Sequence, residues 1–220
     1  DGGCDNALGD VNEDSTLNIQ DLITLVNHIL DNGSLEGCAL DAADMNGDGN
    51  INIQDLITLV NAILGSARVS DVQGIKEAMV EFSTQGDNLK LTIQSQTAIA
   101  GIELSLIAED GTTVSLRTNE KAEEKSSNKN GVMRYLSYTL TNEAIAQSNA
   151  VLLIENAGDL QFDDIKITLV AMDGELIEVT MQDGNGVYQK GDLQFGLNSI
   201  YPNPFNPSAE ISFELQQDGY

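Results

Sequence analysis

The sequence predicts a multi-domain chain that is part helical and part all-β. A helical pair of metal-binding repeats comes first, then an antiparallel β-sandwich and a C-terminal extended strand. Residues 4–30 recur as residues 38–64 with 16 identities in 27 positions, and such a repeat sets the architecture of its segment. From Ile75 onward the apolar residues change from helical spacing to alternation, which indicates strands. We expect a repeat module at 1–65, a linker at 66–74, the sandwich at 75–196 and a final segment at 197–220.

Each repeat opens with a loop that places oxygen-bearing side chains at positions 1, 3, 5, 9 and 12. A hard cation such as Ca²⁺ takes six to eight oxygens, and a twelve-residue loop can wrap them around one ion with a backbone carbonyl at position 7. Mg²⁺ fits less well because it tends to keep its waters. The repeat therefore predicts two calcium ions. The expected ligands are Asp10, Asn12, Asp14, Thr16 (carbonyl), Asn18 and Asp21, then Asp44, Asn46, Asp48, Asn50 (carbonyl), Asn52 and Asp55.

The charge of the repeats also favours bound metal. Residues 1–65 contain twelve Asp and Glu and no Lys or Arg. Three carboxylates in each loop would repel one another unless an ion neutralised them, so we expect the metal-free segment to be largely unfolded. The alternative is a pair of Asx-rich turns without metal. Position 6 needs a sharp turn that suits Gly49 better than Ser15, so the first loop should be the more strained.

An apolar helix should follow each loop, and no convincing helix precedes either loop. Each apolar face is short, so we expect the two repeats to pack together about a pseudo-twofold axis. Cys4 and Cys38 are equivalent under the repeat and could form a disulfide across this axis, as in oxidising compartments. Two free thiols or a zinc pair are the alternatives. The helical apolar residues are Leu22, Leu25, Val26, Ile29 and Leu30, then Leu56, Leu59, Val60, Ile63 and Leu64.

The doubled loop–helix, with Asp at position 12 and no entering helix, resembles a type I dockerin over residues 8–65. In that family the module binds a β-sandwich partner, the cohesin, through loop positions 10 and 11 and the following helix. The Ser-Thr and Lys-Arg pairs of cellulosomal dockerins are absent, which favours an apolar contact through Ile19 or Ile53. An ordinary core role for these residues is the alternative. The resemblance implies partner-binding residues Ile19, Gln20, Val26, Asn27, Ile53, Gln54, Val60 and Asn61.

Alternating segments after Ile75 predict a sandwich of about 110 residues. The sequence predicts a charged loop at residues 119–130 and one helical turn at residues 141–148. The segments 100–106 and 162–169 resemble a cohesin or a related carbohydrate-binding-type sandwich, over about residues 75–190. The expected strands are Met79–Ser83, Asn88–Gln94, Gly101–Ala108, Thr112–Arg117, Val132–Leu140, Ala150–Glu155, Ile165–Met172 and Leu176–Met181.

The C-terminal segment carries a second specific motif. Tyr201-Pro-Asn-Pro-Phe-Asn-Pro207, followed by a strand, resembles the start of the C-terminal sorting domain of type IX secretion substrates. That family continues for several more strands, so we expect a truncated sorting domain at 197–220. A single amphipathic strand, Ala209–Leu215, is not stable alone and should add to its own sandwich or to a neighbour's. A disordered segment is the alternative.

Composition excludes several classes of function. The net charge is −25 with a pI near 4.1, so nothing offers a basic groove for nucleic acid. No apolar run reaches transmembrane length, and membrane insertion is not expected. A nucleophilic triad would need the only histidine, His28, which lies within the repeats. We therefore expect a protein that is not an enzyme.

Together these patterns predict an extracellular or cell-surface, non-catalytic assembly protein stabilised by calcium. The dockerin resemblance implies a plug that joins a cohesin-like β-sandwich on another copy of the chain or on a scaffold protein. Plug and socket on one chain could close intramolecularly or join head to tail in an extracellular fibre. The alternative is an accessory, carbohydrate-binding component of an extracellular polysaccharide-degrading complex that docks on a cohesin scaffold. A fragment of a hydrolase is the third hypothesis.

Overall fold

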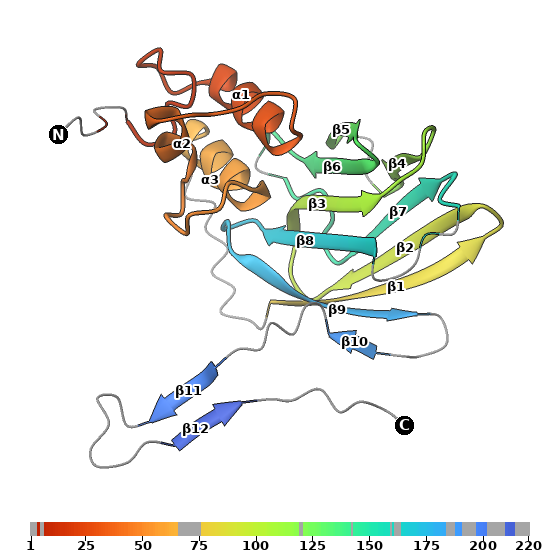
Figure 1. Cartoon of the computed structure of the whole chain (residues 1–220). Coiled ribbons are helices and arrows are strands. Elements are labelled where there is room, and N and C mark those ends of the chain that lie inside the picture. The colour runs from red at the N-terminus through yellow and green to blue at the C-terminus, as the bar shows by residue number, and fades with distance from the viewer. Residues whose placement is uncertain are drawn as a thin grey trace. The chain divides into compact units, whose positions relative to one another are not determined.

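The computed structural model describes residues 4, 7–65, 76–118, 121–141, 143–158, 160, 164–183, 188–190, 197–201 and 210–213. The chain divides into two units, Asp1–Gln189 and Lys190–Tyr220, and each is described by itself. The first unit combines three helices with a β-sandwich (Figure 1). This arrangement is the multi-domain helical and β architecture that the sequence predicted. No described helix is long and apolar enough to cross a membrane.

The two repeats fold into helices α1 (Ile19–Ile29) and α3 (Ile53–Ile63), and each begins at an asparagine cap. The Asn18 and Asn52 Oδ1 atoms accept hydrogen bonds from the backbone N–H groups two residues later, each at 2.7 Å. The carboxylate at loop position 12 accepts the backbone N–H of the cap at 2.9 Å in both repeats. These reciprocal capping boxes satisfy N–H groups that a helix start otherwise leaves unpaired.

One expectation about the repeats was wrong. A short helix, α2 (Cys38–Ala43), precedes the second loop. Its sequence Cys-Ala-Leu-Asp-Ala-Ala is rich in residues of high helix propensity. A helix of six residues is too short to show a helical spacing of apolar residues in the sequence. The predicted disulfide between Cys4 and Cys38 is present and ties the N-terminal segment to the start of α2.

The strands form one continuous ladder in the order β4-β7-β2-β1-β9-β8-β3-β6-β5, and β10 pairs with β9. All eight expected strands are present. Most neighbours are antiparallel, but β1 and β9 are parallel, which the sequence did not predict. The bounds are β1 (Glu77–Gln85), β2 (Asn88–Ser95), β3 (Ile99–Ile107), β4 (Thr113–Leu116), β5 (Glu123–Lys129), β6 (Val132–Tyr138), β7 (Asn149–Glu155), β8 (Ile165–Ala171), β9 (Leu176–Asp183) and β10 (Tyr188–Lys190).

Strand β9 joins the two layers of the sandwich. Its first two residues pair with β8, and residues 178–183 pair with β1. The inner faces of the layers β4-β7-β2-β1-β9 and β8-β3-β6-β5 share one apolar core, which includes Val80, Leu91, Ile102, Leu104 and Tyr135. The outer faces of the two layers are therefore separate surfaces on opposite sides of this core.

Two local expectations in the sandwich were also wrong. The charged segment that was expected to be a loop contains strand β5, which pairs with β6 along its whole length. Its sequence Glu-Glu-Lys-Ser-Ser-Asn-Lys suits the edge of a sheet, where charge discourages pairing with other chains. The described part of residues 141–148 is not helical, because Ala146 bridges to Ile99 of β3 instead.

The C-terminal unit contains β11 (Leu197–Tyr201) and β12 (Glu210–Phe213), which pair antiparallel to each other. The predicted final strand thus finds a partner within its own unit. Residues 202–207 of the proline motif and residues 184–187 lie outside the described residues, as does the whole expected linker at 66–74.

Candidate calcium loops and docking interface

The first loop is closed by carboxylates at its two ends. The Asp10 carboxylate accepts the backbone N–H groups of Asp14 and Ser15, both at 3.0 Å. The Asp21 carboxylate accepts the N–H of Asn12 at 3.1 Å and that of Asn18 at 2.9 Å. The chain therefore turns around these two carboxylates, which are both buried.

The second loop has nearly the same network. The Asp44 carboxylate accepts the N–H groups of Asp48 at 3.1 Å and of Gly49 at 2.9 Å. The Asp55 carboxylate accepts the N–H of Asn52 at 2.9 Å and that of Asn46 at 3.4 Å, and it also accepts the N–H of Met45 at 2.9 Å. Two independent copies of one geometry show that the loop conformation follows from the repeated ligand residues.

The donor set of each loop fits a hard cation. Asp21 and Asp55 are fully buried, yet neither forms an ion pair with a described residue. Burial raises the pKa of the Asp55 carboxyl, and the charge of Asp44 adds to this effect. A buried carboxylate without a basic partner is costly, and a cation that binds there would remove the cost.

Carboxylates alone do not complete either site. Among the described residues no group of three or more His, Cys, Asp or Glu is placed to hold an ion. If an ion binds, the amides of Asn12 and Asn46, which contact Asp14 and Asp48 at 2.9 and 3.0 Å, and the carbonyls of position 7 would have to contribute oxygens. Asn18 and Asn52 cap their helices through Oδ1, so they would reach an ion through water, as position 9 often does.

The first loop stores more backbone strain than the second. Glu13 and Ser15 have φ of 59° and 65°, whereas the equivalent residues Gly47 and Gly49 have 74° and 84°. A side chain in this left-handed region is disfavoured, while glycine adopts it freely. The expectation based on Ser15 is thus supported by the geometry, and Glu13 adds a second strained position.

Helix α3 packs on the outer face of the β8-β3-β6 layer of the same chain (Figure 1). Ile53 and Ile57 are fully buried there. They lie so close to β3 that a Cβ atom on Gly101 would be 2.9 Å from Ile53 Cγ1 and 3.0 Å from Ile57 Cγ1. The absence of a side chain at Gly101 is therefore what allows the helix to approach the sheet. The apolar residues of the sandwich in this shared core are Ala100, Leu136, Tyr138 and Val170.

Polar contacts fix both ends of α3. The Ile53 N–H donates to Glu103 Oε2 at 3.1 Å, so a carboxylate faces the positive end of the helix. At the other end the Asn61 side-chain amide donates to the Met172 carbonyl at 3.3 Å. Arg134 of β6 also reaches the end of α1, where it pairs with Asp31 at 2.8 Å. The polar contacts of the sandwich thus lie at both ends of α3 and, in the first repeat, at the end of α1 and in the residues just after it.

The equivalent face of α1 is exposed. The two helices differ in sequence at one position, His28 against Ala62. Ile19 and Ile23, which correspond to the buried Ile53 and Ile57, are 47% and 56% exposed. The apolar face of α3 therefore packs on a sheet, whereas the nearly identical face of α1 is not covered.

The predicted partner-binding residues fall into three groups. Ile53 and Asn61 contact the sandwich, whereas Val26 and Val60 lie buried in the shared apolar core. Ile19, Gln20 and Asn27 are exposed on α1, and Gln54 is half-buried. Ile57, Gly101 and Glu103, which also contribute to this interface, were not among the predicted residues. The spacing of four residues from Ile53 could have indicated Ile57, but no local signal marks the two sheet residues.

Comparison with known proteins agrees with the analysis of the repeats. Residues 8–64 match the model of the dockerin type I domain. Domains of this family bind calcium and dock on cohesin domains. No curated protein matches the sequence.

Two solved structures are similar to part of the chain. A non-cellulosomal cohesin from Archaeoglobus fulgidus shares 11% identity over 48% of this chain and 86% of its own, with a TM-score of 0.32. A chitin-binding domain of a chitinase from Pyrococcus furiosus shares 16% identity over 46% of this chain and 96% of its own, with a TM-score of 0.27. At such low TM-scores neither similarity bears on what the sandwich binds.

Relief of the strain in the first loop should tighten its calcium binding. The double substitution Glu13→Gly and Ser15→Gly gives this loop the glycines of the second. We expect the first loop to gain about 1 kcal/mol in binding free energy, as measured by titration against a competing chelator. Equal affinity in the variant and the parent chain would contradict the strain argument.

Closing the gap at Gly101 should weaken the contact between α3 and the sheet. Gly101→Ala places a Cβ against two isoleucine side chains, and overpacking of this kind costs about 1–3 kcal/mol. The free energy of unfolding in saturating calcium should fall by that amount. Ser105→Ala, on the same outer face of β3, is the control and should change it little. Equal stability of the Gly101 variant and the control would exclude a tight contact.

The charge of Glu103 should make the contact depend on pH. Burial raises the pKa of the Glu103 carboxyl, although the Ile53 N–H and the Arg134 charge act in the opposite direction. The Glu103 carboxyl therefore binds its proton more tightly in the packed state than in the unfolded chain. The free energy of unfolding falls as the pH rises from the ordinary pKa of a glutamate to the raised pKa, and it is constant above that range. Glu103→Gln removes this loss. The difference in unfolding free energy between variant and parent chain should grow in favour of the variant over that pH range, and a difference independent of pH would contradict this.

Proposed function

We propose that this chain is a secreted, non-catalytic assembly protein whose calcium-stabilised dockerin module has two equivalent docking faces. The α3 face is occupied by the chain's own sandwich. The α1 face is free to dock on a sheet of the same kind, in a cohesin-like domain of another copy or of a scaffold protein. The observation that carries this proposal is the contrast between the buried Ile57 and its equivalent Ile23, which is 56% exposed on a nearly identical helix.

The chemistry of the α1 face supports docking by apolar burial. Removing an isoleucine side chain from water is worth about 1.5–3 kcal/mol. Ile53 and Ile57 gain this free energy on the sandwich, where they lie against Gly101 and pack with the apolar residues of the shared core. Because Ile19 and Ile23 present the same side chains at the same spacing, a sheet face with an equivalent glycine should give a similar gain.

An asymmetry between the repeats explains why the sandwich holds α3 and not α1. Asp31 at the end of α1 pairs with Arg134, and its backbone carbonyl accepts a hydrogen bond from Lys129. The residue equivalent to Asp31 in the second repeat is Gly65, which has no carboxylate. In the reversed arrangement, with α1 on the sheet, this ion pair would be lost. A partly exposed pair contributes about 0–1 kcal/mol, which is enough to bias two otherwise similar arrangements.

Two calcium ions, one in each loop, would hold both docking faces in place, because the N-cap of each helix is also a loop residue. Secretion is supported by the disulfide and by the resemblance of residues 197–220 to a type IX sorting segment. A non-catalytic role is supported by the only histidine, whose Nδ1 accepts the Leu35 N–H at 3.2 Å and so fixes the turn after α1.

A head-to-tail fibre is the assembled form that these contacts allow. A short linker gives the intramolecular contact an effective concentration in the millimolar range, so the closed monomer should dominate in dilute solution. If a helix face of one copy occupied the vacated sheet of the next, the heterologous contact would not close on itself, and an open chain of subunits would grow.

Mixing two versions of the full chain in calcium tests the free face. The double variant Ile23→Glu with Ile57→Glu has no usable helix face and leaves its sheet open. The parent chain keeps its sheet covered and its α1 face free. We expect the two to form a 1:1 complex, measured by calorimetry and light scattering. A parent chain that carries only Ile23→Glu is the matched control and should bind about 100-fold more weakly, because a buried charge replaces an apolar side chain.

The exposure of Ile23 shows that this position is not needed for the fold of the module, so both glutamate substitutions should be tolerated. Calcium-dependent folding of each variant is checked by circular dichroism before mixing. Absence of a complex between folded partners, or an equal affinity for the Ile23→Glu control, would reject the proposal that α1 carries a second docking face.

A further inference from the structure

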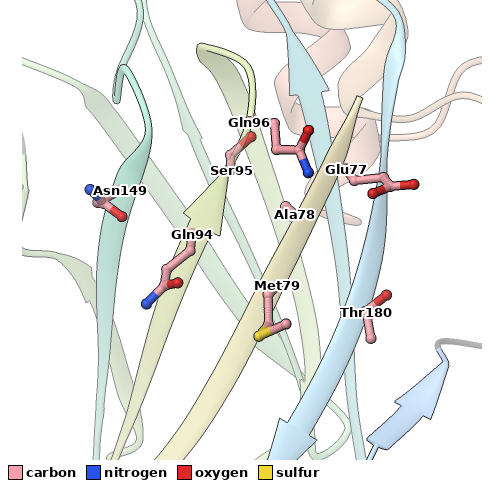
Figure 2. Close-up of a pocket in the computed structure, with 8 residues that line it drawn as sticks. All are labelled: Glu77, Ala78, Met79, Gln94, Ser95, Gln96, Asn149 and Thr180. Atoms are coloured by element: carbon pink, nitrogen blue, oxygen red, sulfur yellow. The ribbon is translucent and has the colours of Figure 1, made fainter. Parts of the chain in front are cut away.

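The layer of the sandwich that lies away from the helices carries an open, shallow cavity of about 460 Å³, in which Glu77, Gln94, Gln96 and Asn149 are exposed (Figure 2). It lies on the outer face of β1, β2, β7 and β9, since the neighbouring residues Val80 and Ile93 point into the core. Cavities of a few hundred Å³ are large enough for a small ligand. The residues that line it are Glu77, Ala78, Met79, Gln94, Ser95, Gln96, Asn149 and Thr180.

Strand register gives these side chains a regular arrangement. Met79 of β1 lies between Gln94 of β2 and Thr180 of β9, and Gln94 in turn lies beside Asn149 of β7. Directly opposed residues have Cβ atoms about 5 Å apart, so the four side chains form one row across four strands. Figure 2 shows Gln96 and Glu77 alongside this row, at the end of β2 and the start of β1.

The polar groups of this cavity have unused hydrogen-bonding capacity. Within the described part of the chain, the side chains of Glu77, Gln94, Gln96 and Thr180 form no hydrogen bond with another described residue. Asn149 donates one bond, to Ser148 Oγ at 3.1 Å. A side-chain amide offers two donors and an acceptor with two lone pairs, and a carboxylate accepts several bonds. Donors and acceptors are therefore mixed along the cavity.

The chemistry of the lining selects the class of ligand. It contains one carboxylate, which is too few for a metal ion, and no basic residue that could bind an anion. Met79 is the only large apolar side chain, so an apolar ligand or peptide finds little surface to bury. A neutral sugar has hydroxyl groups that both donate and accept, and its C–H faces can contact the thioether. We propose that this cavity binds a neutral oligosaccharide.

This site is independent of the docking faces. The apolar core of the sandwich separates it from the face that holds α3, and its side chains take no part in the shared core with the helices. The chain could thus hold a glycan on one layer while the α1 face binds a protein. Glycan binding at this site does not require the proposed assembly function.

A titration of the full ¹⁵N-labelled chain in calcium, followed by NMR, tests the proposal. The probes are hexasaccharides of β-1,4-linked glucose, xylose, mannose and N-acetylglucosamine, and of α-1,4-linked glucose. Because the cavity has no aromatic platform, we expect millimolar affinity for at least one probe. The amide signals that shift should be those of residues 77–79, 94–96, 149 and 180.

The double variant Gln94→Ala with Gln96→Ala should weaken this binding by about tenfold, since two hydrogen-bonding groups are lost. Gln85→Ala is the matched control, because it removes an exposed amide at the far end of β1 and should leave the affinity unchanged. Unchanged signals outside the cavity establish that the variants are folded. The proposal is overturned if no probe shifts the cavity residues at about 10 mM, or if the double variant binds as well as the control.

Discussion

The close approach of α3 to β3 is the contact on which the rest of this structure depends. Two isoleucines can reach the sheet only because Gly101 has no side chain, and the helix start is held by Glu103. This contact joins the helical repeats to the β-sandwich, two parts whose folds are otherwise set by different residues. It also gives the two repeats different environments, since one helix face is buried and its near-identical counterpart is exposed. Assembly, in this account, follows from that difference.

The candidate calcium loops are coupled to the two proposed docking faces through the helix caps. The carboxylate at position 12 accepts the N–H of the cap residue and another from the start of the loop, so the helix cannot begin correctly unless the loop is closed. Ile19 and Ile53 follow the caps directly. A cation that stabilises the loop therefore also fixes the first residue of each docking face, and loss of the metal should release both faces together.

The repeated part of the chain was predictable because its signals are local. The loop residues with oxygen-bearing side chains and the helical apolar residues stand at fixed spacing, and the strands alternate clearly. The position of α3 on the sandwich was not predictable, since it depends on Gly101 and Glu103, which lie about fifty residues away and carry no local signature. Strand β5 was hidden by its charged sequence, which reads as a loop but forms a sheet edge. Helix α2 was too short for its periodicity to appear. The polar cavity combines four strands whose register the sequence alone did not give.

The most direct test of the account is a methyl NMR experiment on the full chain in calcium, with labelled isoleucine side chains. The account predicts nuclear Overhauser contacts between the Ile57 methyl groups and the Gly101 α-protons, because a Cβ on Gly101 would lie 3.1 Å from Ile57 Cδ1. The Ile23 methyl groups should show none. Contacts from Ile23 instead of Ile57, or from neither residue, would contradict the claim that the second repeat occupies the chain's own sheet and leaves the first one free.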